Sequence, residues 1–289
     1  MDRPLVSVAM FAYNEEALID RALDAILACR DEADLVVHVL INGCTDRTEA
    51  IVRARAAADP AIRPVVIVRG DKANAWSHYA HAVAPEAAAI HVFTDGDMQV
   101  QKGAIAAVLA RFAELPEANG CAGMPDSGRQ KAYLHDCIRN GGEMYGNLYA
   151  LRGRFVMRVR AMGVRLPFGL FGEDGFVAAL VKCDLDPTKP WDRRYLTWAE
   201  GGTYRFDELS PLRLEHWRIY RNRRRRYAVR WQQARMIWDL LSREGIGAMP
   251  THVIDLYRRL LSGGLTGKDV WTRLRASNRV GVTRGTLEQ

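Results

Sequence analysis

The first 112 residues alternate between short apolar runs and segments whose apolar side chains recur every three or four positions. The apolar runs are rich in β-formers and have no polar face, so they predict buried strands of a parallel sheet that helices cover on both faces. The predicted strands are residues 5–12, 35–41, 64–68 and 89–93, and the predicted helices are residues 17–28, 46–58, 72–83 and 103–112. An α/β architecture is therefore expected.

Beyond about residue 115 the alternation becomes weaker. Polar residues predict a loop at 125–130, and a second loop is expected at 166–172 before a helix that begins at Glu173. Alternating side chains predict one or two strands in each of two stretches, residues 148–160 and 191–206.

A change of composition near residue 210 indicates a second unit. Residues 213–235 contain nine arginines and one acid, Glu215, and their aromatic and apolar side chains recur at three- and four-residue steps. This pattern predicts a long basic amphipathic helix. We therefore expect a catalytic domain at residues 1–210 and a basic, mainly helical C-terminal extension at residues 211–289.

Positive charge is in excess, with 41 Lys and Arg against 34 Asp and Glu and a formal net charge of +7. The excess favours a polyanionic partner: nucleic acid, an anionic membrane surface or a phosphorylated small molecule. Five widely spaced cysteines without a C-x-x-C pair argue against a disulfide framework or a zinc site and favour a reducing compartment. No signal peptide or long apolar stretch is present, so we expect a cytoplasmic protein, soluble or peripheral on the inner face of the cytoplasmic membrane.

Two carboxylates flank a glycine after the fourth predicted strand, in Asp95-Gly96-Asp97. Open α/β sheets bind ligands at this edge. Carboxylates so close repel each other unless a cation lies beside them, and a hard divalent ion that also binds diphosphate oxygens meets that need. Asp-Gly is also ordinary turn chemistry, and the motif by itself favours a solvated turn.

Polar motifs follow the other predicted strands at the same edge. They are Tyr13-Asn14-Glu15-Glu16 after the first strand, Asn42-Gly43-Cys44-Thr45-Asp46 after the second and Lys72 after the third, with Glu173-Asp174 farther along. In this order the motifs resemble those of the family-2 glycosyltransferases, over about residues 4–185. The resemblance implies a Rossmann-like GT-A fold with a mainly parallel sheet. It also implies metal-dependent transfer of one sugar from a nucleotide-diphosphate sugar, expected to be a UDP-sugar, to an acceptor hydroxyl.

The resemblance assigns nucleotide binding to the ends of the first three strands. Ala12, Tyr13 and Glu15 would cradle the nucleoside, and Lys72 would lie near the donor nucleotide. Asn42 stands where the family usually has an aspartate that binds the base. An amide both donates and accepts hydrogen bonds, so base recognition is retained while the identity of the base is less defined.

The resemblance assigns metal binding and catalysis to the carboxylates. Asp97 is the stronger candidate ligand for Mn²⁺ or Mg²⁺, ahead of Asp95, which with Gly96 is expected at the ribose or a metal-bound water. Asp174, beside Glu173, is the candidate general base for an inverting transfer, in which the metal stabilises the departing diphosphate. Without the other motifs, this acidic pair would simply favour the positive N-terminus of its helix.

The basic segment carries further candidates. Processive members of the family have a Q-x-x-R-W motif and transmembrane helices, whereas here Tyr227 replaces the glutamine before Arg230-Trp231. We therefore expect transfer of a single sugar. Arg230 and Trp231 are candidates for the acceptor side, although a core-facing position suits Trp231 equally well. His216 is a candidate metal ligand, against the commoner structural role of a lone histidine.

Arg221 and the four arginines at 223–226 form the strongest charge run. The run fits a solvated helix face or, with its aromatic neighbours, a helix on an anionic membrane. Nucleic acid is the least favoured partner, because no base-reading module is present. A membrane contact would suit a sugar or lipid-linked acceptor in polysaccharide or glycolipid synthesis.

Two other functions fit the sequence less well. A sugar-nucleotide pyrophosphorylase would need a Gly-rich, Arg-containing loop after the first strand, where this chain has acidic, glycine-free residues. A catalytically degenerate protein that binds nucleotide, membrane or nucleic acid is mildly favoured by Asn42. The intact Asp95, Asp97 and Asp174 count against it.

Overall fold

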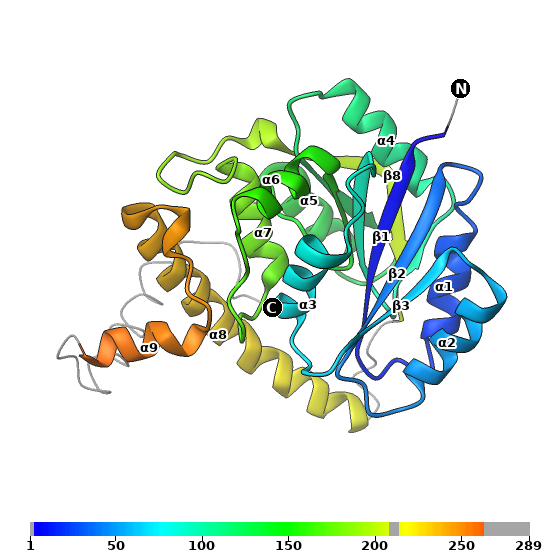
Figure 1. Cartoon of the computed structure of the whole chain (residues 1–289), viewed down its shortest axis with the longest axis horizontal. Coiled ribbons are helices and arrows are strands. Elements are labelled where there is room, and N and C mark those ends of the chain that lie inside the picture. The colour runs from blue at the N-terminus through cyan, green and yellow to red at the C-terminus, as the bar shows by residue number, and fades with distance from the viewer. Residues whose placement is uncertain (1–2, 208–213, 263–289) are drawn as a thin grey trace.

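The computed structural model describes residues 3–207 and 214–262, and within them the chain forms one eight-stranded sheet with helices on both faces (Figure 1). The strands are β1 Leu5–Ala12, β2 Asp34–Asn42, β3 Ile62–Ile67, β4 Ile90–Asp95, β5 Gln99–Val100, β6 Gly120–Pro125, β7 Leu148–Arg152 and β8 Leu196–Arg205. The helices are α1 Ile19–Leu27, α2 Thr48–Ala58, α3 Lys72–His78, α4 Ala104–Glu114, α5 Lys131–Gly141, α6 Gly153–Ala161, α7 Glu173–Lys182, α8 Leu214–Glu244 and α9 Val253–Ser262. The shorter turns are the π-helical η1 Tyr79–Val83 and the 3-10 turns η2 Arg193–Tyr195 and η3 Ile246–Ala248.

The strand order is β3-β2-β1-β4-β7-β6-β8-β5. The four strands β3, β2, β1 and β4 are parallel, β7 runs antiparallel between β4 and β6, and β8 lies parallel to β6. In this register Phe11 is the partner of Asp95, and Ala12 is the partner of Ile41. The carboxyl ends of the first four strands therefore meet at one edge, where the sequence motifs fall.

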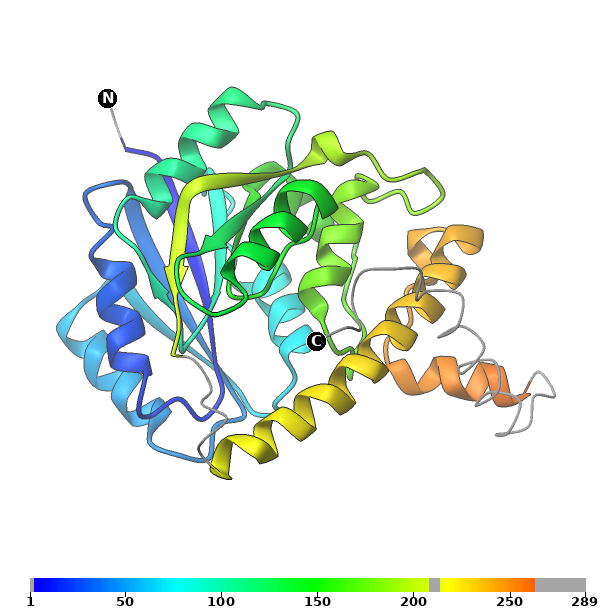
Figure 2. The same cartoon turned by 180° about the vertical axis from the view of Figure 1, so that it is seen from behind.

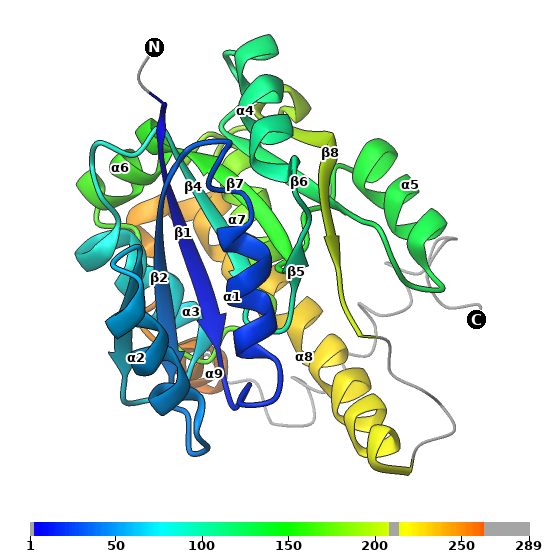
Figure 3. The same cartoon turned by 90° about the vertical axis from the view of Figure 1, so that its right-hand side faces the viewer.

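Each face of the sheet carries its own hydrophobic core. Helices α1, α2 and α4 pack on one face, and α3, α5, α6 and α7 pack on the other (Figures 1 and 3). The second core continues outward to α8 and α9, and α8 runs past α7 along the side of the sheet (Figure 2). The expected mainly parallel sheet, with a helical C-terminal extension, is thus confirmed. No helix in the described parts of the chain is long and apolar enough to cross a membrane.

The second half of the sheet differs from the expectation. Residues 148–160 form strand β7 only as far as Arg152, and α6 begins at Gly153. The helix begins there because the Gly153 amide donates to Ala89 O at 2.9 Å, and a β-carbon at 153 would lie on Ala88 O. Strand β6 and helix α5 have no counterpart in the sequence prediction, because the β6 sequence, GCAGMP, contains no β-branched residue.

A buried polar network crosses the sheet away from the motif edge. Ser7 Oγ lies 2.6 Å from Tyr79 OH and 3.2 Å from His38 Nδ1, and Tyr79 OH lies 2.8 Å from His91 Nδ1. Among the described residues, His91 Nε2 has no hydrogen-bond partner. Burial lowers the pKa of both His38 and His91 to about 4, and the charges of Arg63 and Arg160 add to the effect.

We expect the stability of the protein to fall between pH 6.5 and pH 4. The unfolded chain takes up protons near pH 6.5, whereas the folded chain holds His38 and His91 neutral to about pH 4, so acid favours unfolding by about 2 kcal/mol per histidine at pH 5. Urea unfolding at pH 7 and pH 5 measures this loss. His91→Gln should reduce it by about 2 kcal/mol, and His78→Gln, at an exposed position, should not. Equal losses in wild type and His91→Gln would contradict the assignment.

Candidate active site

The turn after β4 packs directly against the end of β1. The Gly96 amide donates to Phe11 O at 2.7 Å, and a β-carbon at 96 would lie 3.0 Å from that oxygen and 3.3 Å from Ala12 Cα. A larger residue would force the two strand ends apart. Gly96 thus keeps Asp95, at the end of β4, and Asp97, two residues later, beside the end of β1.

Lys72, the first residue of α3, joins two of the predicted carboxylates. Its Nζ lies 2.6 Å from Asp95 Oδ1 and 2.9 Å from Glu173 Oε1. Burial alone would lower the pKa of Lys72, but the carboxylates of Asp95, Glu173 and Asp174 raise it well above its usual range. Lysine is therefore a fixed positive charge that holds the end of β4, the start of α3 and the start of α7 together.

An aromatic layer lies beneath this ion cluster. Lys72 Nζ is 5.2 Å from the centre of the Phe11 ring. Phe93 stacks on Tyr149 with ring centres 4.8 Å apart, and Trp76 Nε1 donates to Tyr149 OH at 3.0 Å. The layer is buried and its polar atoms are satisfied, so it gives the charges a rigid floor of low polarity.

Three hydrogen-bond donors orient the carboxylate of Asp174. Gly146 N donates to Oδ2 at 2.8 Å, Gly175 N donates to Oδ1 at 2.8 Å, and Arg230 Nη2 lies 3.0 Å from Oδ1. Space for Arg230 exists because glycines precede and follow the acidic pair: β-carbons at Gly172 and Gly175 would overlap the arginine side chain. Asp174 is buried, yet its charge is matched by a cation from α8.

Helix α8 is fixed to the loop that carries the acidic pair. Gln233, one turn after Arg230 and buried, accepts from Phe171 N at 2.9 Å and donates to Gly169 O at 3.2 Å. Trp238 packs edge-on against Phe176 of α7, with ring centres 6.2 Å apart. These contacts place Arg230 over Asp174.

The predicted nucleoside residues lie at the ends of β1 and β2. Asn42 is buried, and its Oδ1 accepts from Asp71 N at 2.9 Å, so the amide nitrogen is the part of this side chain left for a ligand. Ala12 is fully buried, and its carbonyl oxygen lies 3.4 Å from Cys44 Sγ. Tyr13 is 59% exposed at the mouth of the same edge and can cover a bound ring.

Four carboxylates gather next to this edge. Burial and then the charges of Asp97, Asp95 and Asp46 raise the pKa of Glu15 to about 8, while its amide donates to Thr48 Oγ1 at 2.8 Å. A cation bound here would relieve the repulsion. The described residues contain no group of three or more His, Cys, Asp or Glu side chains arranged to hold a metal. The side chain of His216, the third predicted ligand, lies outside the described part of the chain.

The predicted site residues are not all brought together. Lys72, Asp95, Glu173, Asp174 and Arg230 form one contiguous ion cluster. Trp231 is instead 45% exposed, and the guanidinium of Arg235 lies 5.7 Å from the centre of its ring. Of the basic run at 221–226, only the side chain of Arg226, which is exposed, is described.

Three residues that position the site were missed in the sequence. Asp71 caps α3 through Asn74 N at 2.7 Å and accepts from Gly169 N at 2.8 Å, and its place directly before the helix is a detectable capping signal. Gly146 and Gln233 carry no local signal, because their partners are 28 and 62 residues away in sequence.

The chain is similar to known proteins in sequence pattern and in fold. The family model of glycosyl transferase family 2 matches residues 7–165, more than half of the chain. None of the curated proteins compared with the chain matches it.

Solved structures share the fold at low sequence identity. A mannosyltransferase from Pyrobaculum calidifontis, in complex with GDP-Man and Mn²⁺, is 20% identical with a TM-score of 0.61, covering 97% of this chain and 81% of its own. Glucosyl-3-phosphoglycerate synthase from Mycobacterium tuberculosis, with Mn²⁺, UDP-glucose and phosphoglyceric acid, is 20% identical with a TM-score of 0.51. The match covers 72% of this chain and 73% of the synthase. TarS from S. aureus, with UDP-GlcNAc, is 14% identical with a TM-score of 0.51. The match covers 73% of this chain and 59% of the TarS chain.

Replacing Lys72 by methionine should destabilise the fold. Asp95 and Glu173 would then remain together without their shared cation, at a cost of about 3 kcal/mol at pH 7, near the low end for a broken buried pair because Lys72 is 30% exposed. The cost should be smaller at pH 5, where the carboxyl groups protonate more readily. Urea unfolding measures both values. Lys102→Met, which removes an exposed ion pair with Asp31, is the matched control and should leave the free energy of unfolding nearly unchanged. Equal effects of the two substitutions would contradict the central role of Lys72.

Proposed function

Because the chain belongs to glycosyl transferase family 2, it is a glycosyltransferase, and we propose that it moves one sugar from a nucleotide-diphosphate sugar to an acceptor hydroxyl with inversion. The observation that carries the proposal is the ion cluster around Lys72. This cluster joins the predicted nucleotide side of the site, at Asp95, to the predicted catalytic side, at Glu173 and Asp174. Lys72 would then fix the position of the nucleotide-binding side relative to the catalytic side.

We propose that Asp174 is the general base. Its carboxylate is held by Gly146 N, Gly175 N and Arg230, so its direction is set before an acceptor arrives. Oδ2 accepts one protein hydrogen bond and retains a lone pair for the proton of an acceptor hydroxyl. That hydroxyl oxygen would attack the anomeric carbon as the bond to the nucleotide diphosphate breaks. Glu173, buried against Lys72, has a positioning role.

We propose that the site takes a divalent metal, Mn²⁺ or Mg²⁺. The closeness of Asp97, Asp95 and Asp46 to Glu15 supports it, because burial and then the charges of these three carboxylates raise the pKa of Glu15 to about 8. Asp97 would be the main protein ligand, with Asp95 next to it and bound to Lys72. When bound, such a metal neutralises charge on a departing diphosphate. Several structural neighbours were solved with Mn²⁺.

A UDP-sugar is the proposed donor. The neighbours bind GDP-mannose, UDP-glucose and UDP-GlcNAc in turn, so the fold accepts different bases and sugars. The amide nitrogen of Asn42 can donate to a base carbonyl, which uracil offers and which guanine offers as well. A lipid-linked acceptor with membrane contact by the arginines at 221–226 stays a prediction, as does a domain boundary near residue 210.

Binding of UDP should require both a divalent metal and Asp97. Calorimetric titration with Mn²⁺ is expected to show binding that EDTA abolishes and that Asp97→Ala weakens at least about tenfold, since the metal loses its protein ligand. GDP and dTDP, titrated in parallel, test the choice of base. Binding that is unchanged by EDTA and by Asp97→Ala would contradict the metal site, and absence of binding by all three nucleotides would contradict the donor class.

Asp174→Asn should abolish sugar transfer while nucleotide binding remains. Loss of a general base is expected to reduce kcat by a factor of about 10² to 10⁴, without weakening UDP in the calorimeter. Asp239→Asn, an exposed aspartate on α8, is the matched control and should leave kcat unchanged. Turnover by Asp174→Asn at the wild-type rate would remove Asp174 as the base.

A further inference from the structure

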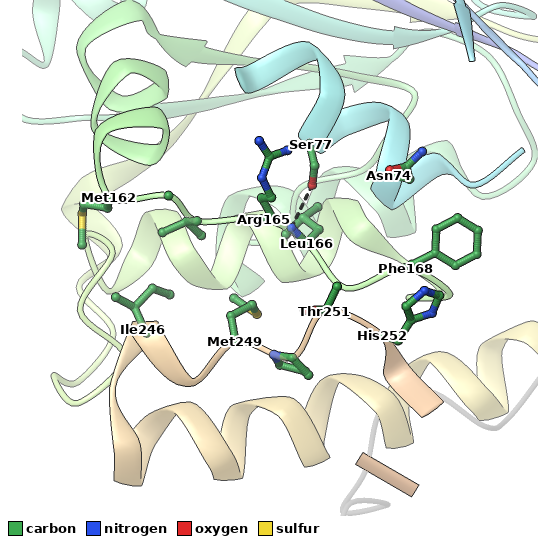
Figure 4. Close-up of a pocket in the computed structure, with 14 residues that line it drawn as sticks. Asn74, Ser77, Met162, Arg165, Leu166, Phe168, Ile246, Met249, Thr251 and His252 are labelled. Carbon is green, nitrogen blue, oxygen red and sulfur yellow. Dashed lines mark hydrogen bonds between the residues drawn. The ribbon is translucent and has the colours of Figure 1, made fainter. Parts of the chain in front are cut away.

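A cavity lies on the side of α3 opposite the ion cluster. Its volume is about 400 Å³, and it is enclosed by α3, the segment between α6 and α7, and the segment that links α8 to α9 (Figure 4). At about 100° per residue, Asn74 and Ser77 of its lining point roughly 140° to 200° away from Lys72 on the same helix. None of the candidate catalytic residues lines this cavity.

One wall of the cavity is apolar. It is formed by Met162 from one side and by Ile246, Met249 and Pro250 from the segment after α8. In Figure 4, Ile246 and Met249 lie across the space from Leu166, while the side chain of Arg165 extends toward α3 beside Ser77. An apolar wall of this size suits a short hydrocarbon chain or ring, which gains by leaving water.

The opposite wall is polar and positive. Ser77, which is 3% exposed, accepts from Leu166 N at 2.8 Å through its hydroxyl oxygen. Arg165 is exposed, and among the described residues it has no ion pair. His252 completes the polar lining and contacts the ring of Phe168 at 4.9 Å between centres.

No carboxylate compensates this charge within the lining that the structure describes. Asp71, which caps α3, uses both oxygens on backbone amides, those of Asn74 and Gly169. Asp255, beyond the linker, pairs with Arg258. A further cation, Arg69, stacks on Phe168 with its guanidinium carbon 3.8 Å from the ring centre. The local field therefore favours an anion.

Backbone hydrogen bonds hold the walls in place. Phe168 N donates to Thr251 O at 2.9 Å, and Val253 N donates to Phe168 O at 3.0 Å. These bonds close the linker onto the segment before α7, so the cavity needs no rearrangement to form. A preformed site costs less ordering entropy on binding.

We propose that this cavity binds a small anion, a phosphate or carboxylate, that carries an apolar chain or ring. The anionic group would lie against Arg165 and Ser77, and the apolar part would lie against Ile246, Met249 and Pro250. The site is separate from the glycosyl-transfer site, and the inference does not depend on the proposed donor or base. Its volume falls in the range of small-molecule pockets, about 300 to 1,000 Å³.

Calorimetric titration of the full chain with hexyl phosphate, inorganic phosphate and 1-hexanol tests the proposal. Hexyl phosphate should bind at least about tenfold more tightly than either of the others, because only it uses both walls. Arg165→Gln should weaken hexyl phosphate about tenfold by removing the charge-assisted contact. Arg63→Gln, an exposed arginine on β3 outside the cavity, should change nothing.

A second variant separates loss of binding from loss of folding. Gly247 lies in the lining, and a β-carbon there would meet no atom within 4 Å, so Gly247→Leu can add a large side chain at the rim without strain, and Gly247→Ala is its smaller control. Thermal unfolding should match wild type for both, while only Gly247→Leu prevents binding. Equal binding of 1-hexanol, equal binding of inorganic phosphate, no binding of hexyl phosphate, or binding untouched by Arg165→Gln and Gly247→Leu would each overturn the proposal.

Discussion

The half-buried charge of Lys72 is the constraint on which the site depends. One ammonium group faces Asp95 from β4 and Glu173 from α7, so three elements far apart in sequence must meet at a single point. Arg230 supplies the second cation, on Asp174. Two cations therefore face three carboxylates, with Asp97 nearby as a fourth acid. Within the described residues these three carboxylates exceed the two cations by one charge, a condition that favours uptake of a further cation.

Glycines make this concentration of charge sterically possible. Gly96 lets β4 end against β1, Gly146 leaves room for Lys72 and Asp174, and Gly172 and Gly175 admit Arg230. Each replaces side-chain volume with backbone amides, two of which bind Asp174 directly. Charged groups thus come within hydrogen-bond distance without the voids or clashes that larger residues would produce. These glycines lose more conformational entropy on folding than other residues would, and in return they allow the charged groups to take fixed positions.

The sequence was most informative where local pattern and final structure have the same cause. Apolar runs such as residues 5–12 are strands because they are buried on both faces, and burial is visible in composition. The segment GCAGMP is a strand because β7 and β8 flank it, and nothing local indicates that. Likewise, Asp95 and Lys72 follow strands and could be placed at one edge. The contact of Arg230 with Asp174 depends on tertiary packing of α8, which no spacing in the sequence determines.

Because α8 supplies Arg230, the residues of the site are synthesised in a definite order. The ends of β1, β2 and β4, with Lys72, are all encoded within the first 95 residues and leave the ribosome first. Arg230 and Gln233 arrive more than 130 residues later. The residues of the proposed nucleotide edge are therefore synthesised long before the arginine that pairs with Asp174. The proposed catalytic side of the site is complete only after the last third of the polypeptide has been made and has docked.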